Sequence, residues 1–80
     1  MLNPAVIRLA ATVIEQADRA HPADAVLRQV LKRSRAEPEL ARQVSRVVFA
    51  YYRWRGWLDS QASMSRQLSK AWKLAEQFAT

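Results

Sequence analysis

Residues 37–59 have the sequence EPELARQVSRVVFAYYRWRGWLD, and this segment contains the clearest helical pattern of the chain. Its apolar residues recur at spacings of three and four, which places them along one face of an α-helix. They are Leu40, Val44, Val47, Val48, Tyr51 and Trp54. Glu37-Pro38 is typical of a helix start, because proline is tolerated at the first helical position. Gly56 is expected to end or kink the helix. The segment therefore predicts an amphipathic helix that begins near Pro38.

Two further helices are expected before this segment. Asn3-Pro4 is typical of an N-cap followed by proline, and apolar residues recur at helical spacing from there to about Arg19. His21-Pro22 interrupts the pattern. A second helix is then expected over about Ala23–Arg35, with a basic C-terminal turn that suits the helix dipole.

A fourth helix is expected after the segment, with Asp59 or Ser60 as its cap. We expect its buried face to consist of Met64, Leu68, Ala71, Trp72, Ala75 and Phe78. The sequence shows no strand pattern and no internal repeat. Its 80 residues are enough for one small domain. We therefore predict an all-α fold, a small helical bundle that occupies residues 1–80.

Composition limits the choice of partner. Thirteen Lys and Arg oppose seven Asp and Glu, which gives a formal net charge of +6. Such an excess favours a polyanion, and nucleic acid before a membrane, although a solvated basic surface would have the same composition. No apolar run approaches the roughly 20 residues that cross a bilayer. The chain has no cysteine, which fits a reducing compartment, and we expect a cytoplasmic location.

No group of residues indicates catalysis. The single histidine, His21, lies in a proline-containing turn, where a capping role is the simpler interpretation. The only glycine is Gly56, so no glycine-rich loop is present to hold a nucleotide or S-adenosylmethionine. Metal-ligand spacing is also absent. We therefore assign no catalytic, cofactor-binding or metal residue, and we expect no enzyme activity from this chain alone.

Basic residues form stripes along the expected helices. Arg42, Arg46 and Arg53 are spaced four and seven apart, on the face opposite the apolar residues. Similar spacings recur at 28–35 and 66–73. Such stripes can follow a phosphate backbone, but every amphipathic helix also has a polar face. The RNA-binding candidates are Arg28, Lys32, Arg35, Arg42, Arg46, Arg53 and Arg55.

Aromatic residues are interleaved with the arginines of residues 49–57. Tyr51 and Trp54 lie on the apolar stripe, so we predict that they are core residues. Phe49 points to the far side, near the arginines. Either this helix is contacted on two sides, or Phe49 meets a partner. The candidates for docking a partner are therefore Phe49 and Trp57.

The segment also resembles a known family. Residues 37–59 are similar to the signature helix of NusB-like domains in the Sun (Fmu, RsmB) family of ribosomal RNA cytosine-C5 methyltransferases. In that family an acidic turn leads through an aliphatic-aromatic helix into Arg-Trp-Arg-Gly-x-Leu-Asp, which here is Arg53 to Asp59. Residues 23–33 are similar to the family's second helix. The last 20 residues fit more loosely.

The resemblance implies a domain that binds ribosomal RNA and takes part in rRNA processing. It also implies packing against the family's downstream methyltransferase domain, which binds S-adenosylmethionine and carries the catalytic cysteines. That domain is absent from residues 1–80. Because a complete NusB-like domain has more than four helices, we expect an incomplete bundle of four to five.

Two alternatives stay open. The chain could be a free-standing NusB-like antitermination factor, or a protein-interaction bundle whose charge serves only solubility. A Rossmann pattern and a Pro-Cys motif downstream would favour the methyltransferase over the antitermination factor. Salt-dependent RNA binding would separate both from the protein-interaction bundle.

Overall fold

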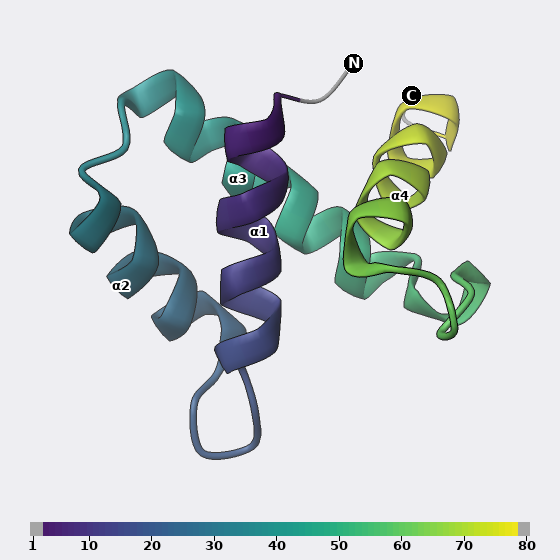
Figure 1. The fold of residues 1–80 in the computed structure, drawn as a ribbon, viewed down its shortest axis with the longest axis horizontal. Coiled ribbons are helices and arrows are strands. Elements are labelled where there is room, and N and C mark those ends of the chain that lie inside the picture. The colour runs from purple at the N-terminus through teal and green to yellow at the C-terminus, as the bar shows by residue number, and fades with distance from the viewer. Residues whose placement is uncertain (1–2, 79–80) are drawn as a thin grey trace.

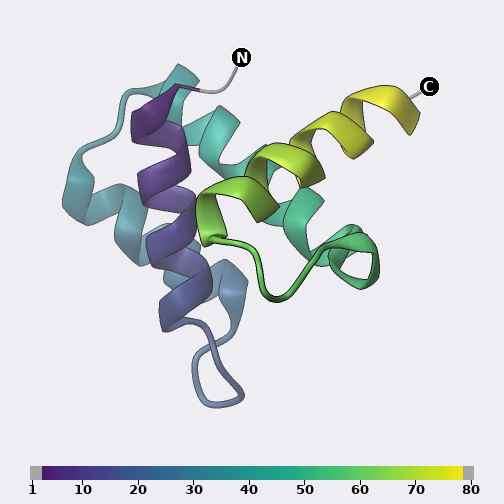
Figure 2. The same cartoon turned by 45° about the vertical axis from the view of Figure 1, so that its right-hand side comes forward.

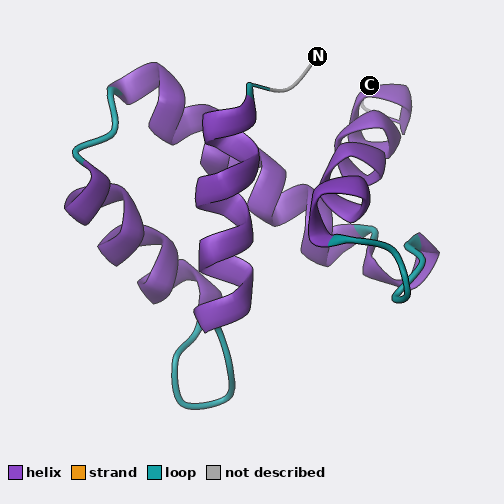
Figure 3. Cartoon of the chain, viewed as in Figure 1, coloured by secondary structure: helices purple, strands orange, loops and turns teal. Residues whose placement is uncertain are grey.

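A computed structural model of the chain describes residues 3–78. This part contains four α-helices, one short 3₁₀ helix and no strand (Figure 3). The elements in chain order are α1 (Pro4–Gln16), α2 (Ala23–Ser34), α3 (Pro38–Arg53), η1 (Arg55–Trp57) and α4 (Met64–Phe78). The predicted all-α bundle is confirmed. None of the helices in the described residues is long and apolar enough to cross a membrane.

Proline and short polar side chains begin the helices as the sequence indicates. The Oδ1 atom of Asn3 accepts a hydrogen bond from the backbone N–H of Ala5 at 2.8 Å, which satisfies a donor that has no partner within α1. Pro4 and Pro38 occupy the first turns of α1 and α3. α1 ends at Gln16, three residues earlier than predicted, because the backbone at Ala17 is extended.

Helix α1 lies at the centre of the bundle. In Figure 1 it stands between α2 and α4, with α3 crossing behind it. It packs against α2, α3 and α4, whereas α2 packs mainly against α1. α3 contacts α1 and α4 to a similar extent. α3 is therefore contacted from two directions, but these contacts leave the side chain of Phe49 60% exposed, so they do not account for its position.

The core is entirely apolar in the described residues. It contains Val6, Ala10, Val13, Val26, Leu27, Val30, Val44, Val47, Val48, Ala50, Tyr51, Leu68 and Ala71. Burying one valine or leucine side chain contributes about 1.5–3 kcal/mol. Since no polar or charged residue is buried among residues 3–78, the groups that could bind a ligand lie on the surface.

The connection between α3 and α4 differs from the prediction. α3 ends at Arg53, and Gly56, which was expected to end or kink the helix, lies three residues further on within η1. α4 begins at Met64, several residues after the expected caps. Asp59 instead closes a turn, because its Oδ1 atom accepts the N–H of Gln61 at 2.9 Å. The side chain of Ser63 accepts the N–H of Arg66 at 3.3 Å and takes the capping role.

Candidate functional site

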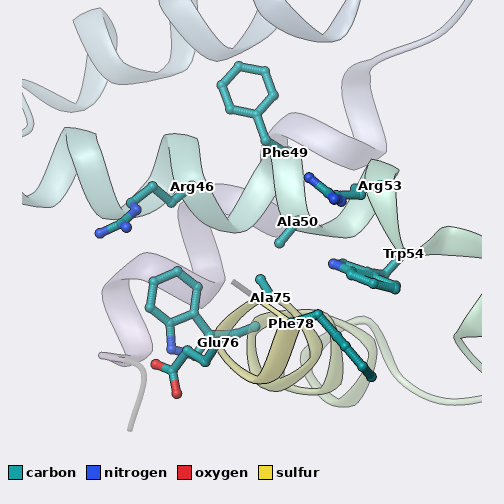
Figure 4. Close-up of a pocket in the computed structure, with 9 residues that line it drawn as sticks. Arg46, Phe49, Ala50, Arg53, Trp54, Ala75, Glu76 and Phe78 are labelled. Carbon is teal, nitrogen blue, oxygen red and sulfur yellow. The ribbon is translucent and has the colours of Figure 1, made fainter. Parts of the chain in front are cut away.

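A groove runs between α3 and the C-terminal half of α4 (Figure 4). It has a volume of about 420 Å³. We call it the α3–α4 groove, and its lining residues are Arg46, Phe49, Ala50, Arg53, Trp54, Trp72, Ala75, Glu76 and Phe78. Three of these are arginine-stripe or docking candidates from the sequence, namely Arg46, Arg53 and Phe49. The structure therefore brings together a subset of the predicted site.

Two alanines lie at the bottom of the groove. Figure 4 shows Ala50 of α3 and Ala75 of α4 facing each other between the two helices. Ala50 is buried and Ala75 is partly buried. Small side chains at this crossing leave space between the larger side chains one turn away on either side. The hollow is thus a consequence of residue size at two facing positions.

Aromatic rings stand at both ends of the groove. At one end the guanidinium of Arg46 lies over the ring of Trp72, 6.0 Å from its centroid. At the other end the rings of Trp54 and Phe78 pack with centroids 5.3 Å apart and an interplanar angle of 32°. The guanidinium of Arg53 lies 5.6 Å from the centroid of Trp54. Each arginine is therefore held at one end of the groove by a cation–π contact.

Positive charge on the α3 side of the groove is not neutralised. The ion pairs among residues 3–78 join His21 to Asp18 and Arg42 to Glu39. Neither Arg46 nor Arg53 takes part in them. The Arg42–Glu39 pair, at 3.6 Å, is exposed and contributes little to stability. Arg46 and Arg53 thus keep their hydrogen-bond donors for a ligand.

Phe49 is covered by neither neighbour of α3. Its side chain is 60% exposed, and Figure 4 shows it pointing away from α4. It follows Arg46 by three residues and precedes Arg53 by four, so all three lie on adjacent parts of one helix face. An exposed aromatic ring beside two unpaired arginines is a surface that suits a polyanion with flat apolar groups.

Of the two predicted core aromatics, Tyr51 of α3 is confirmed, whereas Trp54, which follows the end of α3, lies at the edge of the core. Tyr51 is buried, and Trp54 is partly buried against the core. The Nε1 atom of Trp54 is buried without a hydrogen-bond acceptor. Tyr52 follows Tyr51 in the chain, and the two rings meet edge-to-face with their centroids 5.2 Å apart. Partial burial raises the pKa of the Tyr52 phenol.

The end of α4 differs from the prediction. Leu68 and Ala71 are buried as expected, but Phe78 is 55% exposed. Figure 2 shows the C-terminal end of α4 extending away from α1. Only the first part of the helix is therefore covered by α1, and Phe78 rests on Trp54 instead of in the core.

The basic residues of α2 lie elsewhere. Arg28 and Lys32 are exposed on a helix that packs mainly on α1, and neither lines the α3–α4 groove. α2 ends at Ser34, and Arg35 follows with a left-handed backbone, φ 52° and ψ 41°. Arg35 therefore departs from the helical register that the predicted stripe assumed.

The remaining candidates lie outside the groove. Arg55 and Trp57 belong to η1, and Trp57 is 71% exposed. On α4, three basic residues border a shallow hollow of about 410 Å³ together with two serines. These residues are Ser65, Arg66, Ser69, Lys70 and Lys73. The basic residues are thus distributed over several surfaces, and only α3 combines them with an aromatic groove in the described residues.

His21 has a local structural role. Its backbone N–H donates to Oδ1 of Asp18 at 2.8 Å, and its Nδ1 lies 3.0 Å from the same oxygen. The N–H of Ala20 donates to that oxygen as well, at 2.9 Å. The side-chain hydrogen bond with His21 is the main reason that the pKa of Asp18 is lowered. Within residues 3–78, no three His, Cys, Asp or Glu side chains gather as metal ligands.

Sequence reasoning missed the groove itself. It treated Trp72 and Ala75 as core residues of α4, and it assigned no role to Ala50. The only signal was Ala75, a small residue among larger ones on the predicted apolar face of α4, whereas Ala50 lies off the apolar stripe predicted for α3. Sequence spacing alone does not give the position at which two helices cross, so the facing of these alanines was not available from it.

Comparison of the chain with protein-family models, with curated proteins and with solved structures finds no match. The class that the structure defines is a small all-α bundle. The NusB-like resemblance of residues 37–59 remains an expectation from the sequence.

Proposed function

We propose that this chain is an RNA-binding helical domain, and that α3 provides its principal contact with RNA. The observation that carries the proposal is the pair Arg46 and Arg53, which lie outside the ion pairs of residues 3–78 and flank the exposed ring of Phe49. The net charge of +6 supports a polyanionic partner. The adjoining groove supports a partner that also has apolar, flat groups.

The spacing of the two arginines suits separate phosphates. Seven residues of α-helix span about 10 Å at a rise of roughly 1.5 Å per residue. A guanidinium can donate two parallel hydrogen bonds to one phosphate, which a lysine ammonium cannot do. Each of the two arginines would therefore hold a different phosphate of the same strand. Arg42 takes a lesser part, because Glu39 competes for its guanidinium.

The biological setting is proposed from the resemblance of residues 37–59. In that setting the domain holds ribosomal RNA for a downstream methyltransferase domain, which uses S-adenosylmethionine to modify cytosine C5. The exposed Trp57, which lies outside the α3–α4 groove, would then be available to pack against that domain. A protein-interaction bundle is the alternative, and the apolar part of the groove is the feature that favours it.

A salt titration of RNA binding tests the proposal. We compare Arg46→Gln/Arg53→Gln with Arg19→Gln/Arg33→Gln, which removes the same charge away from the groove. Glutamine is a comparable helix former, so both variants should keep the circular dichroism spectrum of the parent. Only the first should bind a single-stranded RNA more weakly. Its slope of log K against log salt should flatten by about 0.7 for each lost phosphate contact.

Equal effects of the two double variants would contradict the proposal, since they would mean that binding depends on net charge alone. An absence of any salt-dependent RNA binding by the parent would reject RNA as the partner.

A further inference from the structure

We propose that the α3–α4 groove holds one unstacked nucleobase, so that the domain selects single-stranded RNA over duplex. This inference rests on the proposed function, because it concerns the same surface. It goes further in naming the form of RNA and the part of the nucleotide that enters the groove.

The lining of the groove suits a flat aromatic group. Ala50 and Ala75 leave the hollow between them, and aromatic side chains stand at both ends. Its volume of about 420 Å³ lies within the roughly 300–1,000 Å³ range of small-ligand sites. When a base stacks on an aromatic side chain, water is removed from the apolar faces of both groups. Such stacking is tolerant of sequence.

The charges around the groove determine which side of it the RNA backbone should occupy. Arg46 and Arg53 lie on the α3 side, whereas Glu76 lies on the α4 side. Phosphates are attracted by the arginines and repelled by the carboxylate of Glu76. The backbone should therefore pass along α3, with a base turned inward toward Ala75. Phe49, which lies between the two arginines on α3, is placed to contact a neighbouring base.

Duplex RNA cannot use this site. Its bases are paired and stacked inside the helix, and proteins reach mainly its phosphates and 2′-hydroxyls. The two arginines could contact a duplex, but the groove would stay empty. Selectivity for single strands should therefore come from the groove, while the salt dependence comes from the arginines.

An aromatic or aliphatic side chain of a partner protein could fill the same hollow. The charge on its α3 side favours RNA, because two unpaired arginines beside an apolar groove match a chain that alternates phosphates with flat bases. The protein alternative is an outcome of the following test.

The experiment measures fluorescence anisotropy with three labelled ligands of equal length. They are a single-stranded RNA, the same backbone with every base removed, and an RNA duplex. The parent should bind the single-stranded RNA at least about fivefold more tightly than the abasic strand, the lower end of the effect of one stacked base. Stacking of a base on a tryptophan should also quench tryptophan fluorescence. This is measured in the Trp57→Phe variant, which lacks the most exposed tryptophan.

Ala75→Leu is the variant that blocks the groove, because leucine favours a helix and its side chain fills the hollow. Gln77→Leu is its control, since Gln77 is exposed on the same helix and does not line the groove. Ala75→Leu should reduce the preference for the base-bearing strand to what contact with Phe49 alone provides, but keep the abasic affinity and the salt slope. Gln77→Leu should behave as the parent.

Equal affinity of the parent for the base-bearing and abasic strands would overturn this inference and leave the proposed function standing. That comparison needs no variant, so it decides the matter even if Ala75→Leu fails to fold. No binding of any of the three ligands would overturn both the inference and the proposed function, and would favour a protein partner for the groove.

Discussion

Trp54→Ala should lower the free energy of unfolding by about 2–3 kcal/mol. A fully buried tryptophan truncated to alanine costs about 3–5 kcal/mol. Trp54 is only partly buried, and its Nε1–H lies buried without an acceptor. An unsatisfied buried donor costs about 1–3 kcal/mol, and the truncation removes that cost together with the ring. The expected loss is therefore below that of a fully buried tryptophan.

Trp54→Phe separates the two contributions. It keeps an aromatic ring against Phe78 and removes the N–H, so the free energy of unfolding should change by less than about 1 kcal/mol. Urea and thermal unfolding followed by circular dichroism measure both variants. For a domain of this size a change of 1 kcal/mol shifts Tm by roughly 4–8 °C. A loss in Trp54→Phe as large as that in Trp54→Ala would show that the N–H is satisfied, and would refute the reasoning.

Four further outcomes are expected. Arg35→Gly should raise the free energy of unfolding by about 0.5–1 kcal/mol, because Arg35 has a left-handed backbone; an unchanged urea midpoint would contradict this. Gly56→Ala should raise the free energy of unfolding by about 0.4–1 kcal/mol, since the φ of Gly56 is not positive and nothing lies within 4 Å of the added Cβ. A lower free energy of unfolding would contradict this. An NMR titration should give Asp18 a pKa below the ordinary aspartate value of 3.8. The contribution of Asp18 to stability is therefore present above pH 3.8 and disappears as the pH falls through the lowered pKa. A raised pKa would exclude the hydrogen bonds between Asp18 and His21. Calorimetry with millimolar S-adenosylmethionine should give no saturable heat, because residues 3–78 contain no strand to carry a cofactor loop.

The starts of three helices could be predicted because local chemistry determines them. Asn3-Pro4, Pro22 and Pro38 fix backbone geometry wherever they occur, so α1, α2 and α3 begin close to the expected residues. The start of α4 was predicted too early. Asp59 can cap a helix or close a turn, and the hydrogen bond from Gln61 shows that it closes a turn.

The composition of the site could be predicted only in part. Helical spacing placed Arg46, Phe49 and Arg53 on one face, and all three are exposed. The same spacing grouped Phe78 with the core, although it is exposed beyond the reach of α1. The groove depends on where α3 and α4 cross, and that position is set by packing between segments distant in sequence. Periodicity within one helix contains no information about it.

The most direct test of the account is an NMR titration of the isotope-labelled chain with a single-stranded RNA. Binding on α3 should shift the backbone amide signals of residues 46–54 and 72–78 and leave those of α2 nearly unchanged. Shifts concentrated on Arg28 and Lys32, or no shifts at millimolar RNA, would contradict the claim that α3 and the α3–α4 groove contact RNA.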